Sequence, residues 1–127
     1  MFKRIDHIEI VPLNMEKSIE FYTKVLGFKV LNRHKVDAMP LEEVVYLKLN
    51  DTMLELLKVK GPRYTLKEQW QTGIRGFALE VEDMGKAVEY LKSKGINITW
   101  GPMDLGEIKR AEIKDPDELI IELRQWK

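Results

Sequence analysis

The order of hydrophobic and polar positions is repeated once along this chain. An alternating run at 5–11 is followed by a helical pattern and further apolar runs, and the same order starts again at 74–81. His7 in the first run corresponds to Gly76 in the second, 69 positions later. A repeat of this kind indicates a duplicated supersecondary unit, and therefore two similar structural modules.

The first copy opens with a strand that has two different faces. Ile8 and Ile10 alternate with His7 and Glu9, which predicts a strand over 5–11 with one apolar face and one ionisable face.

A helix and three more strands complete the first copy. Apolar residues recur at helical spacing over 15–26, Asn14 is a suitable N-cap, and Gly27 lies where a glycine commonly ends a helix. The further strands are expected at 28–36, 44–49 and 53–59, with a hairpin turn at Asn50-Asp51 between the last two.

The second copy follows the same plan. Asp83 and Gly95 frame a helix expected over 84–94, and a short linker with Gly61-Pro62 precedes the copy. Strands are expected at 74–81, 96–100, 106–113 and 119–123, with turns at Gly101-Pro102 and Asp115-Pro116-Asp117.

Each copy therefore has the element order β-α-β-β-β, and the fold class is α+β. One helix can cover only one face of a four-stranded sheet, so two modules with mixed sheets are expected to curl around a shared cleft with the helices outside. The expected single domain spans 1–127, with module one at about 1–60, a linker at about 61–72 and module two at about 73–127.

Composition narrows the classes of function. The 127 residues are 44% hydrophobic and 33% charged, which indicates a globular protein. Twenty-one basic residues balance twenty-one acidic ones, so charge gives no reason to expect a nucleic acid or a membrane as partner. The absence of cysteine excludes disulfides and thiolate chemistry. No secretory signal or membrane-length apolar run is visible, and a cytoplasmic location is expected.

The ionisable residues fall on the faces that the helices leave open. The duplication defines four equivalent positions on the first and last strands of each copy, occupied by His7, Glu55, Gly76 and Glu122. An imidazole and two carboxylates on rigid strands form a ligand set for a divalent cation. Considered individually, Glu55 and Glu122 are explained equally well as solvated or salt-bridged strand residues.

A charge argument also favours the cation. Two carboxylates brought together in a cleft repel each other, and a divalent cation removes that penalty. A protonated carboxyl group or a nearby cationic side chain would do the same. Arg110 or Lys109 on a neighbouring strand could reach the site, whereas Arg75 has the wrong strand parity.

Several motifs resemble the vicinal oxygen chelate superfamily, which includes glyoxalase I, methylmalonyl-CoA epimerase, fosfomycin resistance proteins, extradiol dioxygenases and bleomycin resistance proteins. The resemblance is carried by Asp6-His7-Ile8, Ser18-Ile19-Glu20-Phe21-Tyr22 through Leu26-Gly27-Phe28, Met53-Leu54-Glu55-Leu56, and Asp115-Pro116-Asp117 with Ile121-Glu122-Leu123. It implies paired β-α-β-β-β modules, frequent dimers, and a metal held by His7, Glu55 and Glu122.

Gly76 departs from the family pattern, because it stands where the fourth ligand would be. His34, the other histidine, does not match that position and is interpreted as a surface or strand residue. Dioxygenase and fosfomycin-type members have two histidines and one carboxylate, so both activities are disfavoured. One nitrogen and two carboxylates shift the expected metal from zinc toward manganese, magnesium, cobalt or nickel.

Two functions are consistent with these residues. The first is a metal-dependent isomerase or lyase that acts on a small carbonyl substrate through a metal-stabilised enediolate, with Glu122, Glu55 or Glu80 as the proton acceptor. The second is a metal-free small-molecule binding protein of the bleomycin-resistance type. In both cases a homodimer is expected, because the sheets would have exposed edges.

Overall fold

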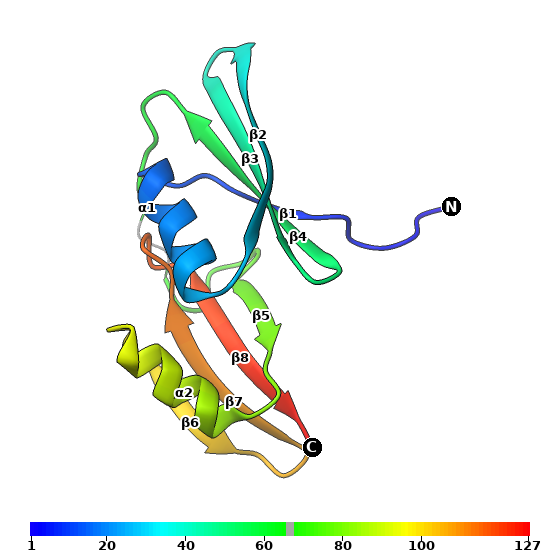
Figure 1. Ribbon diagram of the computed structural model, residues 1–127, viewed down its shortest axis with the longest axis vertical. Helices are drawn as coiled ribbons and strands as arrows, with labels where there is room; N and C mark the ends of the chain where they lie inside the picture. Colours follow the sequence, from blue (N-terminus) through cyan, green and yellow to red (C-terminus); the bar gives the residue numbers. More distant parts are fainter. Residues whose placement is uncertain (66–67) are drawn as a thin grey trace. The chain divides into compact units, whose positions relative to one another are not determined.

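The structure is a computed structural model that describes residues 1–65 and 68–127. The chain divides into two compact units, Met1–Thr65 and Leu66–Lys127, and each unit contains one four-stranded sheet and one helical segment (Figure 1). The expected linker at 61–72 forms no helix or strand in its described part, and residues 66–67 lie outside the described residues.

The first unit has the expected β-α-β-β-β order. Its elements are β1 (Ile8–Ile10), α1 (Met15–Glu20), the π-helical segment η1 (Phe21–Val25), β2 (Lys29–Ala38), β3 (Leu41–Leu49) and β4 (Thr52–Val59). The sheet order is β1-β4-β3-β2, and only the pairing of β1 with β4 is parallel.

The second unit repeats this topology. Its elements are β5 (Gly76–Glu80), α2 (Met84–Ser93), β6 (Trp100–Asp104), β7 (Ile108–Lys114) and β8 (Ile120–Trp126). The sheet order is β5-β8-β7-β6, again with a parallel pairing between the first and last strands. The α+β fold class and the duplication are therefore confirmed.

Both helices begin at the residues that the sequence indicated. Asn14 Oδ1 accepts a hydrogen bond from the backbone N–H of Lys17 at 3.0 Å, and Asp83 Oδ1 accepts one from Lys86 at 2.9 Å. The first helix differs from the expectation after Glu20, where it widens into η1 and the N–H of Leu26 donates to the carbonyl oxygen of Phe21.

The prediction of a strand at 96–100 that ends in a turn at Gly101-Pro102 was wrong. Instead, β6 spans Trp100–Asp104 and contains the Gly-Pro pair, because the register with β7 shifts between Trp100 and Met103 and absorbs it as a bulge. Gly101 has φ +75°, and a Cβ there would lie 2.7 Å from the carbonyl oxygen of Arg110, so glycine is required at this position.

Each sheet buries one face beneath its own helical segment (Figure 1). In the first unit, Leu54 and Leu56 of β4 are buried. In the second unit, Ile121 and Leu123 of β8 are buried together with the apolar stripe of α2, which consists of Met84, Val88 and Leu91. Among the described residues, the opposite face of each sheet has no helix of its own unit over it, and Glu9, Glu55 and Glu122 project from that face.

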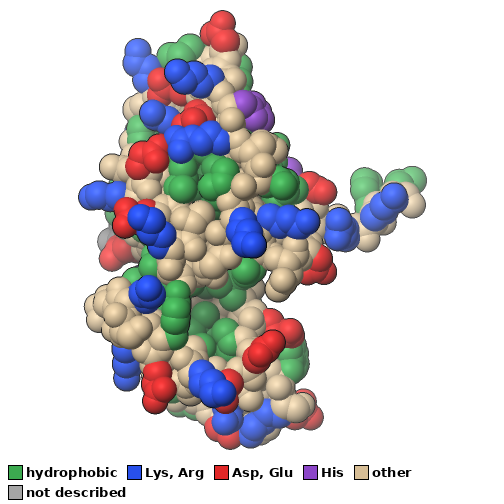
Figure 2. Space-filling model, in the orientation of Figure 1, with side chains coloured by type: hydrophobic (Ala, Val, Ile, Leu, Met, Phe, Trp, Pro, Cys, Tyr) green, Lys and Arg blue, Asp and Glu red, His purple; other side chains and the backbone are tan. Residues whose placement is uncertain are grey.

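Basic and acidic side chains are interspersed on the face of the molecule shown in Figure 2. This distribution agrees with the balanced net charge of the sequence. Among the described residues, no helix is long and apolar enough to cross a bilayer.

Candidate functional site

The first unit brings an imidazole and two carboxylates together on the open face of its sheet. Nε2 of His7 lies 2.7 Å from Oε2 of Glu55 and 3.7 Å from Oε1 of Glu9. One potential ligand atom from each of these three residues lies within 4.8 Å of the others. We call this group the His7 cluster.

The strand pairing explains why these residues meet. The parallel register of β1 and β4 places Glu9 opposite Glu55, so both side chains project from the same face of the sheet. His7 immediately precedes β1 and is two residues before Glu9, which directs it to that face too. Only 7% of Glu55 is exposed, and a carboxylate at that depth requires a cationic or hydrogen-bonding partner.

Two neighbours complete the surroundings of the imidazole. Oδ2 of Asp6 lies 2.8 Å from Nδ1 of His7, so the ring is held between two carboxylates. The hydrogen bond to Asp6 is the largest cause that raises the pKa of His7; burial opposes it, and the charge of Glu55 adds to it. Tyr46 lies opposite Glu55 on β3 and meets the His7 ring edge-on, with ring centroids 5.9 Å apart.

Burial and the nearby negative charge of Glu55 raise the pKa of the Tyr46 phenol. Neither Tyr46 nor Asp6 was identified as a site residue from the sequence. Asp6 could have been found, because a carboxylate adjacent to a candidate ligand histidine is a usual partner for its second ring nitrogen. Tyr46 could not be found without the register of β3 against β4.

The chemistry of the His7 cluster fits a divalent cation. Asp6 on Nδ1 leaves Nε2 as the ring atom directed at Glu55, which is the arrangement that metal-binding histidines commonly have. Carboxylate oxygens from Glu55 and Glu9 supply the hard donors that accompany it.

The second unit lacks the equivalent imidazole for a steric reason. In the register of β5 with β8, Gly76 lies opposite Ile120 and Ala78 lies opposite Glu122, so Gly76 and Ala78 replace His7 and Glu9 while Glu122 replaces Glu55. A Cβ at Gly76 would overlap the carbonyl oxygen of Ile120 and lie 3.0 Å from its carbonyl carbon. The two strands are therefore too close together there for any side chain.

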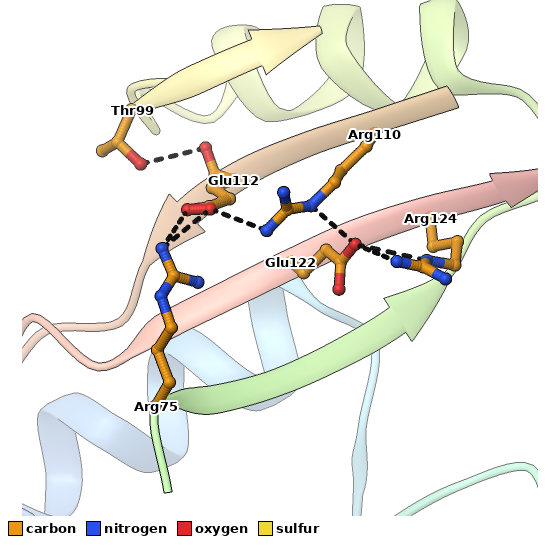
Figure 3. Close-up of polar contacts among 6 residues, drawn as sticks. All are labelled: Arg75, Thr99, Arg110, Glu112, Glu122 and Arg124. Carbon is orange, nitrogen blue, oxygen red and sulfur yellow. Dashed lines mark hydrogen bonds and ion pairs between the residues drawn. The ribbon is translucent and has the colours of Figure 1, made fainter. Parts of the chain in front are cut away.

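Arginines surround Glu122 in the second unit (Figure 3). Its Oε1 lies 2.7 Å from Nε of Arg110 and accepts hydrogen bonds from Nη2 and Nε of Arg124 at 2.8 and 3.2 Å. The neutralisation by Arg110 was one of the alternatives open at the sequence level. The contribution of Arg124 was missed, although its position two residues after Glu122 on the same strand could have indicated it.

The other residues singled out from the sequence are not members of the His7 cluster. Glu80 is exposed at the end of β5, opposite Arg124 in the strand register. His34 is exposed on β2, and its ring centroid lies 6.4 Å from that of Tyr46. Nη2 of Arg75 donates a hydrogen bond to Oε1 of Glu112 at 3.0 Å.

Comparison with known proteins identifies the family. The Glyoxalase/Bleomycin resistance protein/Dioxygenase superfamily matches residues 4–123, which is nearly the whole chain. The chain belongs to this superfamily.

Relatives with assigned names include two kinds of enzyme. The chain is 35% identical over 130 residues to a lactoylglutathione lyase of Neisseria meningitidis, covering 98% of this chain and 91% of that one. It is 29% identical over 134 residues to the human mitochondrial methylmalonyl-CoA epimerase, covering 96% and 73%. It is also 28% identical to the lactoylglutathione lyase GLX1 of Arabidopsis thaliana, but spans only 44% of the length of that plant relative.

Solved structures agree on the fold. A glyoxalase family protein from Enterococcus faecalis superposes with a TM-score of 0.81 at 28% identity, covering 97% of this chain and 98% of that one. The glyoxalase I of Leishmania major superposes with a TM-score of 0.79 at 27% identity, covering 98% and 87%. The similarity supports a glyoxalase-like fold.

Proposed function

We propose that this protein is a metal-dependent lyase or isomerase that acts on a small carbonyl substrate. Its relatives named lactoylglutathione lyase and methylmalonyl-CoA epimerase support the class of reaction. The observation that carries the proposal is the 2.7 Å contact between His7 and the buried Glu55, with Glu9 within reach.

His7 and Glu55 are the central metal ligands of this proposal. Glu122 is the third, because the strand register makes it the counterpart of Glu55 in the second copy. To bind a cation, Glu122 would have to exchange its contacts with Arg110 and Arg124. Glu9 is the carboxylate that could take that place within the first unit. The donor set of one nitrogen and several oxygens favours manganese, magnesium, cobalt or nickel over zinc.

When bound, the cation would act as a Lewis acid toward the substrate oxygens and stabilise the negative charge that develops as a proton next to the carbonyl is removed. The protein groups supply the proton acceptor. Glu122, Glu55 and Glu80 are the candidates, and a carboxylate oxygen of one of them would take the proton and return it to the neighbouring carbon. Asp6 keeps the His7 ring oriented throughout.

The proposal is tested by measuring metal content after purification without chelator. We expect close to one manganese, nickel or cobalt ion per chain, and we expect its loss in His7→Ala and Glu55→Gln. His34→Ala is the matched control, because it removes the other, exposed histidine and should keep the metal. Wild-type protein that binds none of manganese, cobalt and nickel at micromolar concentration, and no magnesium at millimolar concentration, would refute the metal-dependent function.

A metal-free binding protein is the outcome that the arginines around Glu122 would favour, since they neutralise this carboxylate without a cation. In that case a chelator would leave thermal stability unchanged.

A homodimer is part of the proposal as well, because the outer strands β2 and β6 present unpaired edges within their units. Analytical ultracentrifugation measures this directly.

A further inference from the structure

Five charged side chains of the second unit form a continuous chain with alternating signs (Figure 3). In order they are Arg75, Glu112, Arg110, Glu122 and Arg124, and we call them the arginine–glutamate chain. Arg75 and Arg110 contact Glu112 at 3.0 and 3.3 Å, and Arg110 and Arg124 contact Glu122 at 2.7 and 2.8 Å. Four of the five lie on β7 and β8, on the face away from α2.

The carboxylates of the arginine–glutamate chain are more deeply buried than its guanidinium groups. The side chains of Glu112 and Glu122 are 8% and 16% exposed, whereas those of Arg75, Arg110 and Arg124 are 29%, 28% and 31% exposed. Three guanidiniums against two carboxylates leave one positive charge. The other charged strand residues of this face, Glu80 and Lys114, have opposite signs and do not alter that surplus.

Two of the guanidiniums also have a buried Nε atom without a hydrogen-bond partner. The buried Nε atoms of Arg75 and Arg110 have no hydrogen-bond partner among the described residues. The contact of the Arg110 Nε with Glu122 is therefore an ion pair in which the N–H is not directed at the oxygen. An unpaired buried donor costs free energy, and because both Nε atoms are buried, a ligand on the surface would be bound by the other nitrogen atoms of these guanidiniums.

Each guanidinium of this chain lies over a tryptophan ring. Arg75 is 5.1 Å from the centroid of Trp70, Arg110 is 5.0 Å from that of Trp100, and Arg124 is 5.1 Å from that of Trp126. These are all three tryptophans of the protein, and all three are exposed. Trp100 and Trp126 lie on β6 and β8, and Trp70 lies in the linker that precedes β5. Exposed aromatic side chains beside cations commonly mark a binding surface.

From these observations we infer that the open face of the second sheet binds an organic monocarboxylate that carries a planar ring. A carboxylate matches the flat fork of a guanidinium and can accept two hydrogen bonds from it. One negative charge balances the single surplus charge, whereas a dianionic phosphate would leave a net negative charge next to two buried glutamates. The planar ring stacks on the tryptophan faces that the arginines leave open.

This binding needs neither a metal nor His7, so it can be tested independently of the proposed function. If both hold, the inference names the chemical class of the substrate. If metal binding fails, the same surface remains the site of a carboxylate-binding protein.

Benzoate is the probe for the test, and benzamide is its neutral isostere. We expect benzoate to shift the indole N–H resonances of the three tryptophans in the NMR spectrum of chelator-treated protein at millimolar concentration, and we expect benzamide to have no comparable effect. Phenyl phosphate, the dianionic analogue, should bind more weakly than benzoate. His7→Ala should bind benzoate as the wild type does.

Two variants change the surplus charge in opposite directions. Arg124→Gln leaves the arginine–glutamate chain without net charge. It should weaken benzoate binding by about tenfold, the usual effect of losing one charge-assisted hydrogen bond. Glu112→Gln raises the surplus positive charge of the arginine–glutamate chain and should strengthen the binding of both benzoate and phenyl phosphate. Arg33→Gln is the matched control, because Arg33 pairs with two glutamates in the first unit and should leave affinity unchanged. Equal shifts with benzoate and benzamide, or unchanged affinity in both Arg124→Gln and Glu112→Gln, would overturn the inference.

Discussion

His7 and Glu55 are separated by most of the first unit in sequence and are joined by a 2.7 Å contact in the fold. The contact depends on the parallel pairing of β1 with β4, which brings the first and last strands of the unit side by side. It gives the buried Glu55 a partner and leaves the imidazole between two carboxylates. The pairing of His7 with Glu55 is thus built into the topology of one module.

Asp6→Asn tests whether Asp6 orients the His7 ring. The amide keeps the size of the side chain but removes the charge that holds Nδ1. We expect the affinity for manganese or nickel to fall by about tenfold or more, the usual effect of losing a carboxylate behind a ligand histidine. Isothermal titration calorimetry measures it, and Asp51→Asn in the exposed β3–β4 turn is the control. Equal affinities in the two variants would contradict the assigned role.

Gly76→Ala should be strongly destabilising. The added Cβ overlaps the backbone of Ile120, so the parallel pairing of β5 with β8 must shift. We expect a loss of about 2 kcal/mol or more in the free energy of unfolding, as for other overpacked sites. Urea denaturation followed by circular dichroism provides the measurement.

The control for that substitution is Gly85→Ala in α2, where the nearest atom to an added Cβ is Asp83 Oδ1 at 3.4 Å. Alanine is a better helix former than glycine, so this variant should gain about 0.5–1 kcal/mol. If Gly76→Ala were as stable as Gly85→Ala, the close approach of β5 and β8 would be wrong.

Glu43→Gln should change how stability depends on pH. Hydrogen bonds from Arg33 hold the pKa of Glu43 below its ordinary value of 4.5. A depressed pKa in the folded state means that the ion pair stabilises the protein above pH 4.5 and that this contribution is lost as the pH falls through the lower, folded-state pKa. At neutral pH we expect the variant to be less stable by about 0.5–1 kcal/mol, because Arg33 is partly exposed.

The difference between wild type and Glu43→Gln should shrink when denaturation is repeated at successively lower pH below 4.5. The exposed neighbour Glu42 provides the control, since Glu42→Gln should leave the pH profile close to that of the wild type. A difference in stability that stays constant from neutral to acidic pH would argue against the ion pair as the cause of that difference.

Asn14→Ala removes the side-chain acceptor at the start of α1. The N–H of Lys17 would lose its 3.0 Å partner, and the helix should lose about 1 kcal/mol. Asn14→Asp retains an acceptor and should restore stability. Thermal unfolding of the three proteins side by side measures the effect, and an Asn14→Ala variant with wild-type stability would exclude a capping role.

Local patterns predicted much of this fold because they depend on neighbouring residues. Asn14 and Asp83 each cap a helix, and the strand pattern correctly placed Glu55 and Glu122 on the faces that the helices leave open. The bulge at Gly101-Pro102 was not predictable in this way, since it exists only in the register of β6 against β7.

The candidate site was likewise predictable only in its local features. Strand parity placed His7, Glu55 and Glu122 on open faces, but parity does not say which residues lie opposite one another. The register does, and it adds Glu9 and Tyr46 to the surroundings of Glu55. The partners of Glu122 likewise depend on long, flexible arginine side chains, whose choice among nearby carboxylates is decided by three-dimensional packing.

The close approach of β5 to β8 at Gly76 limits how the second copy can be changed. A histidine at this position would meet backbone rather than open space, so a counterpart of His7 cannot be introduced by this one substitution. Compensating changes that spread the two strands would have to come first. Directed evolution toward a two-histidine centre should therefore start from β8, and not from residue 76 itself.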